Sequence, residues 1–184
     1  HYVLNGRKMW ITNASICDVI NVTSSVGKDE RGLSRMMRIV VERDASPFDA
    51  HEIPTLGLRQ GHLGEVVFEN CRVPKANQLG EVGDAARILT LTWLANRPIL
   101  GLCAVHMADA ALQAALKYAG DRVQFGRTIG STQLVQEMLA DISTAITTSR
   151  LLCYYALSCI DKGDRANQIS AMAKRYAIAS CQRA

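Results

Sequence analysis

The sequence predicts an α+β fold, with a small β-rich domain in residues 1–79 followed by an antiparallel α-helical bundle in residues 80–184. Short runs rich in β-branched residues, separated by Gly, Asn and Pro, fill the first part and indicate strands. Beyond residue 80 the apolar residues recur at three- and four-residue steps, which indicates helices. Aromatic residues make up only 5% of the chain, and alanine is frequent in the second part. This combination favours closely packed helices over a large β-sandwich.

The first part contains several candidate strands. Residues 2–4 and 8–12 flank Asn5-Gly6, a pair that predicts a two-residue hairpin turn because both positions tolerate positive φ. The polar segment 24–31 is expected to separate the next two strands. These two strands are predicted at residues 19–23 and 37–41, and a further strand at residues 65–69, ended by Asn70 and Pro74.

Three helices are expected in the second part. The first begins after Asp84 as N-cap and runs to about Ala119, where Gly120 should stop it, and Pro98 should bend it. The second spans about Thr132 to Lys162, with Ser131 as candidate N-cap and Gly163 at the C-terminal cap. The third begins near Arg165 and continues to the last residue, so the helical domain is expected to be incomplete. The first residues of the chain likewise predict a truncated amino terminus.

Composition excludes some classes of protein and leaves others open. The net charge of +4 is scattered along the chain, which argues against a nucleic-acid-binding arm but suits an anionic small molecule. The apolar stretch 99–116 is interrupted by His106 and Asp109, which predicts a buried helix rather than a membrane span. Six cysteines without a C-x-x-C pair favour reduced, buried thiols and no metal site.

Three separated segments carry a more specific signal. They are YVLNGRKMWITNA at residues 2–14, FENCRVP at residues 68–74 and DRVQFGRTI at residues 121–129. In this order and at this spacing they resemble the acyl-CoA dehydrogenase family, and the resemblance covers essentially the whole chain. It implies the later part of a central, β-barrel-like domain and three of the four helices of the C-terminal bundle. A first helical domain would precede them.

The first segment offers groups suited to a flavin. On a regular strand Trp10 and Thr12 would share one face, giving a flat apolar wall beside a hydroxyl. The resemblance implies that Trp10, Ile11 and Thr12 contact FAD, with the tryptophan shielding the flavin and the threonine hydrogen-bonding its edge. Taken alone, the strand is explained better by an ordinary buried tryptophan, and the other segments reverse that preference.

The third segment offers groups suited to a pyrophosphate. A guanidinium can donate two parallel charge-assisted hydrogen bonds to phosphate oxygens. The resemblance implies FAD contacts in a neighbouring subunit, which would require at least a dimer, and it also implies a homotetramer with shared FAD sites. The residues concerned are Arg122, Gln124, Phe125, Ile129 and Gln133. The alternative for Arg122 is a solvated arginine at a helix end, interacting with the helix dipole.

The first helix carries the substrate-binding candidates implied by the resemblance, Trp93, Asn96 and Arg97, although Trp93 could equally be a packing residue. Some branches of the family place the catalytic glutamate at the position of Asn96. An amide does not accept a proton near neutral pH. No catalytic residue is therefore assigned, and the base is expected downstream of Ala184 or is absent.

The resemblance implies a flavoprotein of fatty acid metabolism that oxidises an acyl-CoA thioester to the trans-2-enoyl-CoA and passes electrons to an electron-transferring flavoprotein. The location implied is intracellular, in a bacterial cytoplasm or a mitochondrial matrix. Three alternatives stay open: an oxygen-using flavoenzyme such as an acyl-CoA oxidase, nitroalkane oxidase or monooxygenase; a catalytically silent partner subunit; and an enoyl-CoA reductase. The isolated fragment is expected to bind FAD poorly and to be inactive.

Overall fold

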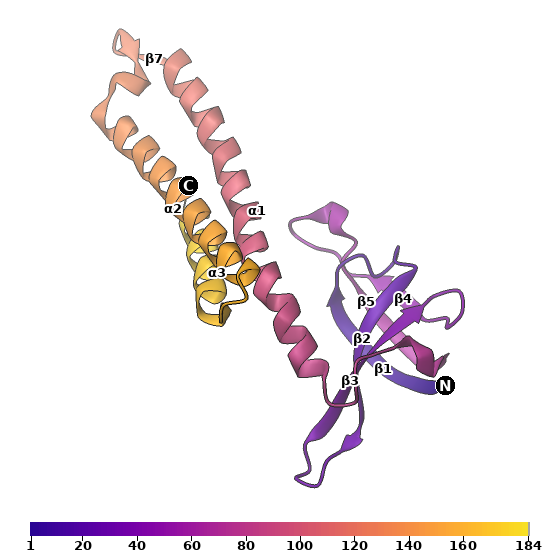
Figure 1. Ribbon diagram of the computed structural model, residues 1–184. Coiled ribbons are helices and arrows are strands. Elements are labelled where there is room, and N and C mark those ends of the chain that lie inside the picture. The colour runs from indigo at the N-terminus through magenta and orange to yellow at the C-terminus, as the bar shows by residue number, and fades with distance from the viewer. Residues whose placement is uncertain (184) are drawn as a thin grey trace. The chain divides into compact units, whose positions relative to one another are not determined.

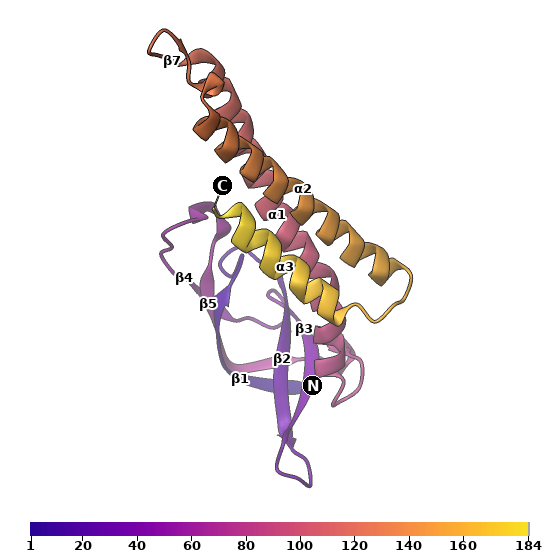
Figure 2. The ribbon, with the colours of Figure 1, turned by 90° about the vertical axis from the view of Figure 1, so that its left-hand side faces the viewer.

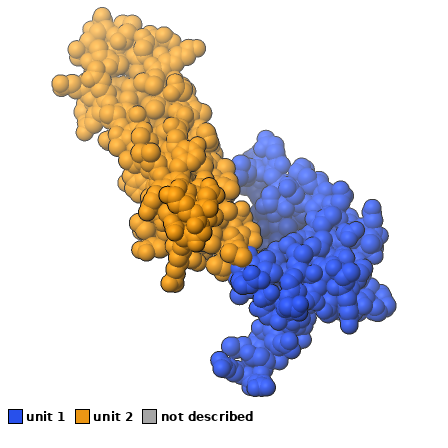
Figure 3. Space-filling view, in the orientation of Figure 1, with its two compact units in different colours: residues 1–88 blue, residues 89–184 orange. Residues whose placement is uncertain are grey.

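The computed structural model describes residues 1–183 and divides into two compact units, residues 1–88 and 89–184 (Figure 3). The first unit consists of antiparallel strands and the second of three helices with a short hairpin (Figure 1). The predicted α+β class is therefore confirmed.

The first unit contains two three-stranded antiparallel sheets. One has the order β1-β5-β4, formed by Tyr2–Ile11, Gly64–Val73 and Asp49–Glu52. The other has the order β2-β3-β6, formed by Val19–Lys28, Ser34–Glu42 and Gln78–Leu79. Two short 3-10 turns, Arg59–Gly61 and Lys75–Asn77, lie in the connections.

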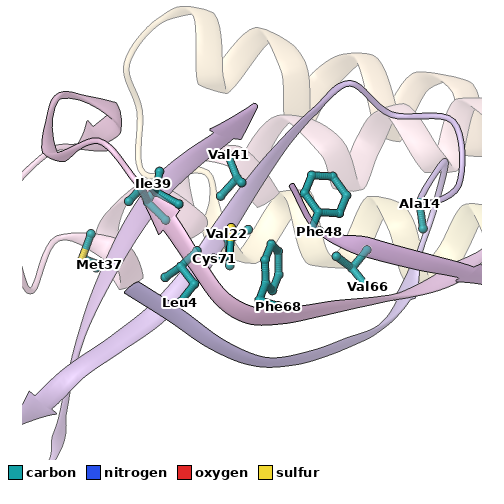
Figure 4. Packing of buried hydrophobic residues seen from close by; sticks show 11 residues of the cluster. Leu4, Ala14, Val22, Met37, Ile39, Val41, Phe48, Val66, Phe68 and Cys71 are labelled. Carbon is teal, nitrogen blue, oxygen red and sulfur yellow. The ribbon is translucent and has the colours of Figure 1, made fainter. Parts of the chain in front are cut away.

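The core of this unit follows from the alternation of its strands. In β3 the side chains of Met37, Ile39 and Val41 are buried at every second position, because successive side chains point to opposite faces of a strand. Phe48 and Phe68 pack with ring centroids 5.5 Å apart in the same cluster (Figure 4).

The predicted hairpin at Asn5-Gly6 is wrong. Strand β1 runs unbroken through both residues and pairs with β5, more than sixty residues later in the sequence. The register shifts between Leu4 and Gly6, and the Asn70 amide donates to the Asn5 side-chain oxygen at 2.8 Å. The pair therefore marks a β-bulge, where the same tolerance for unusual backbone angles is needed.

Two further strand predictions need correction. Strand β2 continues to Lys28, so most of the polar segment 24–31 is strand rather than loop. Strand β5 likewise runs past Asn70 to Val73. The short edge strand Asp49–Glu52 was not predicted, because its sequence DAHE has neither β-branched residues nor a clear alternation.

The second unit is built from helices α1 (Ala85–Asp121), α2 (Gln133–Asp161) and α3 (Asn167–Cys181). The first four residues of α1 belong to the first unit. Helices α1 and α2 are joined by a hairpin of β7 (Val123–Gln124) and β8 (Arg127–Thr128) and a 3-10 turn, Ile129–Ser131 (Figures 1 and 2). Buried residues of all three helices, among them Val105, Cys153 and Ala177, form one core.

The helix ends differ slightly from expectation. Helix α1 continues past Gly120 to Asp121, and Thr132 rather than Ser131 occupies the N-cap of α2. The Ser131 hydroxyl instead donates to the Thr128 carbonyl at 2.6 Å. Gly163 follows α2 with a φ of 77° and its amide donates to the Ile160 carbonyl at 2.9 Å, as a C-terminal cap requires.

Helix α1 continues through Pro98, which is buried. Proline has no N–H, so the carbonyl of Leu94, four residues earlier, loses its usual partner in the helix. The hydroxyl of Ser170 on α3 donates to this carbonyl at 2.5 Å. A hydrogen bond between helices thus replaces the one that the proline removes.

The apolar stretch 99–116 was predicted to be buried, and only one face of it is. Val105, Ala108 and Leu112 lie in the helical core, whereas Met107 is 71% exposed. Judged only by its length and composition, α1 is long and apolar enough to cross a membrane. Core helices of soluble proteins meet the same two criteria.

All six cysteines are free thiols. Burial raises the pKa of Cys71 and, together with the nearby Cys181, that of Cys153. Cys103 is exposed, so the prediction of buried thiols is wrong for this residue. No cluster of potential metal ligands occurs within residues 1–183.

Candidate functional site

Trp10 lies at a distortion of strand β1. The register between β1 and β5 shifts between Lys8 and Ile11, and Trp10 itself has a φ of 61°. Positive φ is rare for a bulky side chain, and bulges commonly redirect side chains near functional sites. The indole is 66% exposed, so the alternative of a buried core tryptophan does not apply to this residue.

Ile11 and Thr12 follow at the end of the strand. Strand β1 ends at half-buried Ile11, and Thr12 is exposed in the turn that follows. The bulge interrupts the regular alternation on which the shared face of Trp10 and Thr12 was based, so strand geometry no longer supports that part of the prediction. The segment still presents an aromatic surface and a hydroxyl to the outside of this unit.

A polar cluster that the sequence did not reveal lies close to this turn. The Ser15 hydroxyl donates to Glu52 Oε1 at 2.6 Å, and His62 Nδ1 lies 2.6 Å from the same oxygen. Both hydrogen bonds lower the pKa of Glu52. Because Ser15 and His62 contact the carboxylate and not each other, the cluster is not a nucleophilic triad. Its members lie up to 47 positions apart in the sequence, so spacing could not indicate it.

The second group of candidates lies on the hairpin between α1 and α2. Gln124 pairs with Arg127, which leaves Phe125 and Gly126 as the two turn residues, with φ of 52° and 77°. Phe125 is 99% exposed. The Ile129 amide donates to the Arg122 carbonyl at 2.9 Å and closes the base of the hairpin.

The polar members of this group are accessible. Arg122, Gln124 and Gln133 are exposed, and Gln133 is the first residue of α2. Ile129 is half-buried. A guanidinium, two amides and an exposed aromatic ring therefore lie within residues 122–133, where they could bind an anionic ligand with an aromatic part.

The third group lies on α1. The Arg97 guanidinium sits over the Trp93 ring, 5.7 Å from its centroid, as expected for residues one helical turn apart. Trp93 is 48% exposed and Asn96 is exposed. Trp93 is therefore not simply a core residue of this unit, and the three side chains form a cationic and aromatic surface suited to an anionic, partly apolar molecule.

Family models match most of the chain. The model described as "Acyl-CoA dehydrogenase, middle domain" matches residues 1–71, and "Acyl-CoA dehydrogenase, C-terminal domain" matches residues 87–184. Among sequence relatives, glutaryl-CoA dehydrogenase of Desulfococcus multivorans is 35% identical over 96% of this chain and 46% of its own length. The caffeyl-CoA reductase-Etf complex subunit CarC of Acetobacterium woodii is 33% identical over 98% and 48%.

Solved structures show the same relationship. Butyryl-CoA dehydrogenase from Megasphaera elsdenii has a TM-score of 0.93 and 30% identity, over 99% of this chain and 48% of that one. The prolyl acyl carrier protein oxidase AnaB has a TM-score of 0.88 and 26% identity, over 97% and 47%. The chain thus spans about half the length of the relatives it matches. Two family models in sequence order, together with these relatives, show that the chain belongs to the acyl-CoA dehydrogenase family of flavoprotein oxidoreductases.

Proposed function

We propose that the full-length protein catalyses the FAD-dependent α,β-dehydrogenation of an acyl-CoA thioester. The observation that carries this proposal is the exposed Trp10, held at positive φ beside Thr12 in a chain of this family. A conformationally strained residue is costly for a folded protein. A flat ring system stacked on the indole would offset that cost.

The donor groups of the chain fit FAD. We assign the isoalloxazine-facing role to Trp10, Ile11 and Thr12, which present an aromatic surface and a free hydroxyl. Arg122, Gln124, Phe125, Ile129 and Gln133 would hold the pyrophosphate and adenosine part, through the guanidinium, the amides and apolar contact. The chemistry that FAD supplies when bound is acceptance of the β-hydrogen of the substrate together with its electron pair.

The residues on α1 would bind the substrate. Arg97 offers a positive charge to the phosphates of coenzyme A, and Trp93 offers apolar surface. Asn96 can hydrogen-bond the substrate but cannot remove the α-proton, because its amide is not a base near neutral pH. We therefore propose that this proton passes to a carboxylate outside these 184 residues.

Assembly and electron transfer are part of the same proposal. Phe125 is almost fully exposed on a preformed hairpin, which supports a contact with FAD in a second copy, within a homotetramer. CarC is named as a subunit of an Etf complex, which supports an electron-transferring flavoprotein as the acceptor. An intracellular location, where acyl-CoA thioesters are found, follows from this substrate class.

A second candidate is an oxygen-using enzyme of the same fold. The similarity to AnaB, named as a prolyl acyl carrier protein oxidase, favours it, and fold alone does not decide the chemistry. The two candidates differ in how fast the reduced protein reacts with air.

Anaerobic titration of the full-length flavoprotein with acyl-CoA thioesters tests the proposal. We expect a subset of thioesters to bleach the visible flavin band, and slow recovery in air to favour the dehydrogenase over the oxidase. Bound FAD that no thioester reduces would contradict the proposal and favour a silent subunit.

A further inference from the structure

Arg43, directly after strand β3, contacts the turn that follows Trp10 and Thr12. Its Nη2 donates to the Ala14 carbonyl at 2.8 Å and its Nη1 donates to the Ser15 carbonyl at 3.1 Å. A planar guanidinium can place two such bonds on neighbouring carbonyls, which a lysine cannot match. One side chain thus holds two consecutive peptide groups.

The orientation of this guanidinium is fixed by its surroundings. It lies over the Phe48 ring, 4.6 Å from the centroid, and Phe48 packs against Phe68 in the core. The Arg43 amide donates to the Asp18 carbonyl at 2.7 Å. Within residues 1–183 its buried Nε has no hydrogen-bond partner. The guanidinium therefore contacts the two carbonyls and the ring while one of its own N–H groups stays unpaired.

Further hydrogen bonds and close packing also hold the turn that Arg43 contacts. The amides of Ile16 and Cys17 both donate to the Asn13 carbonyl, at 3.2 Å and 2.9 Å. Ala14 is fully buried, and a Cβ added to Gly64 would lie only 2.8 Å from the Ala14 Cβ. The start of the turn is therefore packed against strand β5 with no room to shift toward it.

Trp10 needs such an anchor because its own side chain provides none. The indole is mostly exposed, its backbone is in a sparsely populated region, and the regular strand ends one residue later. A strained conformation persists only where the surrounding structure over-determines it. Pairing with β5 fixes the segment before Trp10, and the Arg43-bound turn fixes it after Thr12.

We propose that Arg43 is a positioning residue for the flavin site, acting through the Ala14 and Ser15 carbonyls on Trp10 and Thr12. The inference rests on the proposed function for its catalytic consequence. Its structural part, that Arg43 holds this turn, stands separately and can be tested without FAD.

The test uses the full-length protein and three variants. R43M keeps a side chain of similar length over Phe48 but removes every side-chain donor. R43K keeps the charge but not the planar pair of donor nitrogens. R38M is the matched control, because Arg38 also lies on this sheet, where its Nε donates to the Asn21 side chain at 3.0 Å, away from the turn.

Amide hydrogen exchange in the apoprotein provides the first measurement. Loss of charge-assisted hydrogen bonds should loosen the turn, so the Ile16 and Cys17 amides should exchange about tenfold faster in R43M. R43K should lie between R43M and wild type, and R38M should match wild type. Unchanged exchange of these amides in R43M would overturn the proposal.

Flavin spectra and single-turnover reduction of the holoprotein provide the second measurement. We expect R43M to shift the visible flavin band and to slow flavin reduction by about tenfold at unchanged thioester affinity, because small misplacements of reacting groups cost rate. A wild-type band and rate in R43M would overturn the proposal. If R43M does not fold, the same criteria apply to R43K, for which an intermediate rate is expected.

The two proposals fail in different ways. If no thioester reduces the wild-type flavin, the proposed function fails, whereas the exchange data and the flavin band of R43M still decide the role of Arg43. If wild type is reduced and R43M behaves like R38M in both measurements, the proposed function stands and the role of Arg43 is refuted.

Discussion

The Leu94 carbonyl shows how one side chain can compensate for a break in a helix. Pro98 deprives this carbonyl of its intrahelical donor, and the fully buried Ser170 hydroxyl supplies another at 2.5 Å. Buried acceptors without a partner cost about 1–3 kcal/mol. The serine at this position is thus explained by the donor that Pro98 lacks, because its hydroxyl satisfies the Leu94 carbonyl.

We therefore expect Ser170→Ala to lower the free energy of unfolding by about 1–3 kcal/mol, because the carbonyl is left without a partner. In a Pro98→Ala background the restored N–H satisfies the carbonyl, so the same serine substitution should cost clearly less. Chemical denaturation of the four proteins measures this coupling. An equal cost in both backgrounds would show that the two residues act independently.

At the scale of elements, the helix crossing at Gly101 is set by close contact. A Cβ added there would lie 2.7 Å from Cys153 Sγ on α2 and 3.2 Å from Ala177 Cβ on α3. Both neighbours are fully buried. Alanine would gain about 1 kcal/mol of helix propensity, but overpacking a core costs about 1–3 kcal/mol.

Gly101→Ala should accordingly destabilise the protein by about 1 kcal/mol, and Cys153→Ala in the same chain should recover part of the loss by removing the sulfur. Gly120→Ala is the matched control: it lies in the same helix with nothing within 4 Å of an added Cβ. We expect that control to be neutral or stabilising, and thermal unfolding compares the three. Stabilisation by Gly101→Ala would refute the close crossing.

Helices were easier to predict from the sequence than strands, and the particular elements show why. The cap at Gly163 and the periodicity of α2 depend on residues within a few positions of one another. The role of Asn5-Gly6 instead depends on pairing with β5, more than sixty residues away. Arg43 and the cluster around Glu52 were not identified for the same reason, since their partners converge only in the folded sheet.

At the scale of the whole molecule, the residues proposed to contact FAD fall in both compact units. Trp10 belongs to the first and Arg122 to the second. The sequence resemblance named both groups, but it could not show that Trp10 sits in a bulge or that Phe125 is almost fully exposed, because both properties depend on backbone geometry.

In the full-length protein, Arg122→Ala should weaken FAD binding by about 10- to 100-fold, since hydrogen bonds to charged groups contribute about 1.5–3 kcal/mol. Titration of the apoprotein with FAD, followed by flavin fluorescence, measures the dissociation constant. Arg175→Ala, an exposed arginine on α3, should leave the constant unchanged. Equal constants for the two variants would remove Arg122 from the proposed site.

The hairpin between α1 and α2 has backbone interactions of its own. The Ile129 amide and the Arg122 carbonyl close its base, and two turn residues with positive φ form its tip. An eight-residue peptide spanning Arg122 to Ile129, joined end to end into a ring, should therefore keep its form outside the protein. If the hairpin contacts a second copy as proposed, such a cyclic peptide should compete for the surface that it contacts and would be a starting point for molecules that disrupt the proposed assembly.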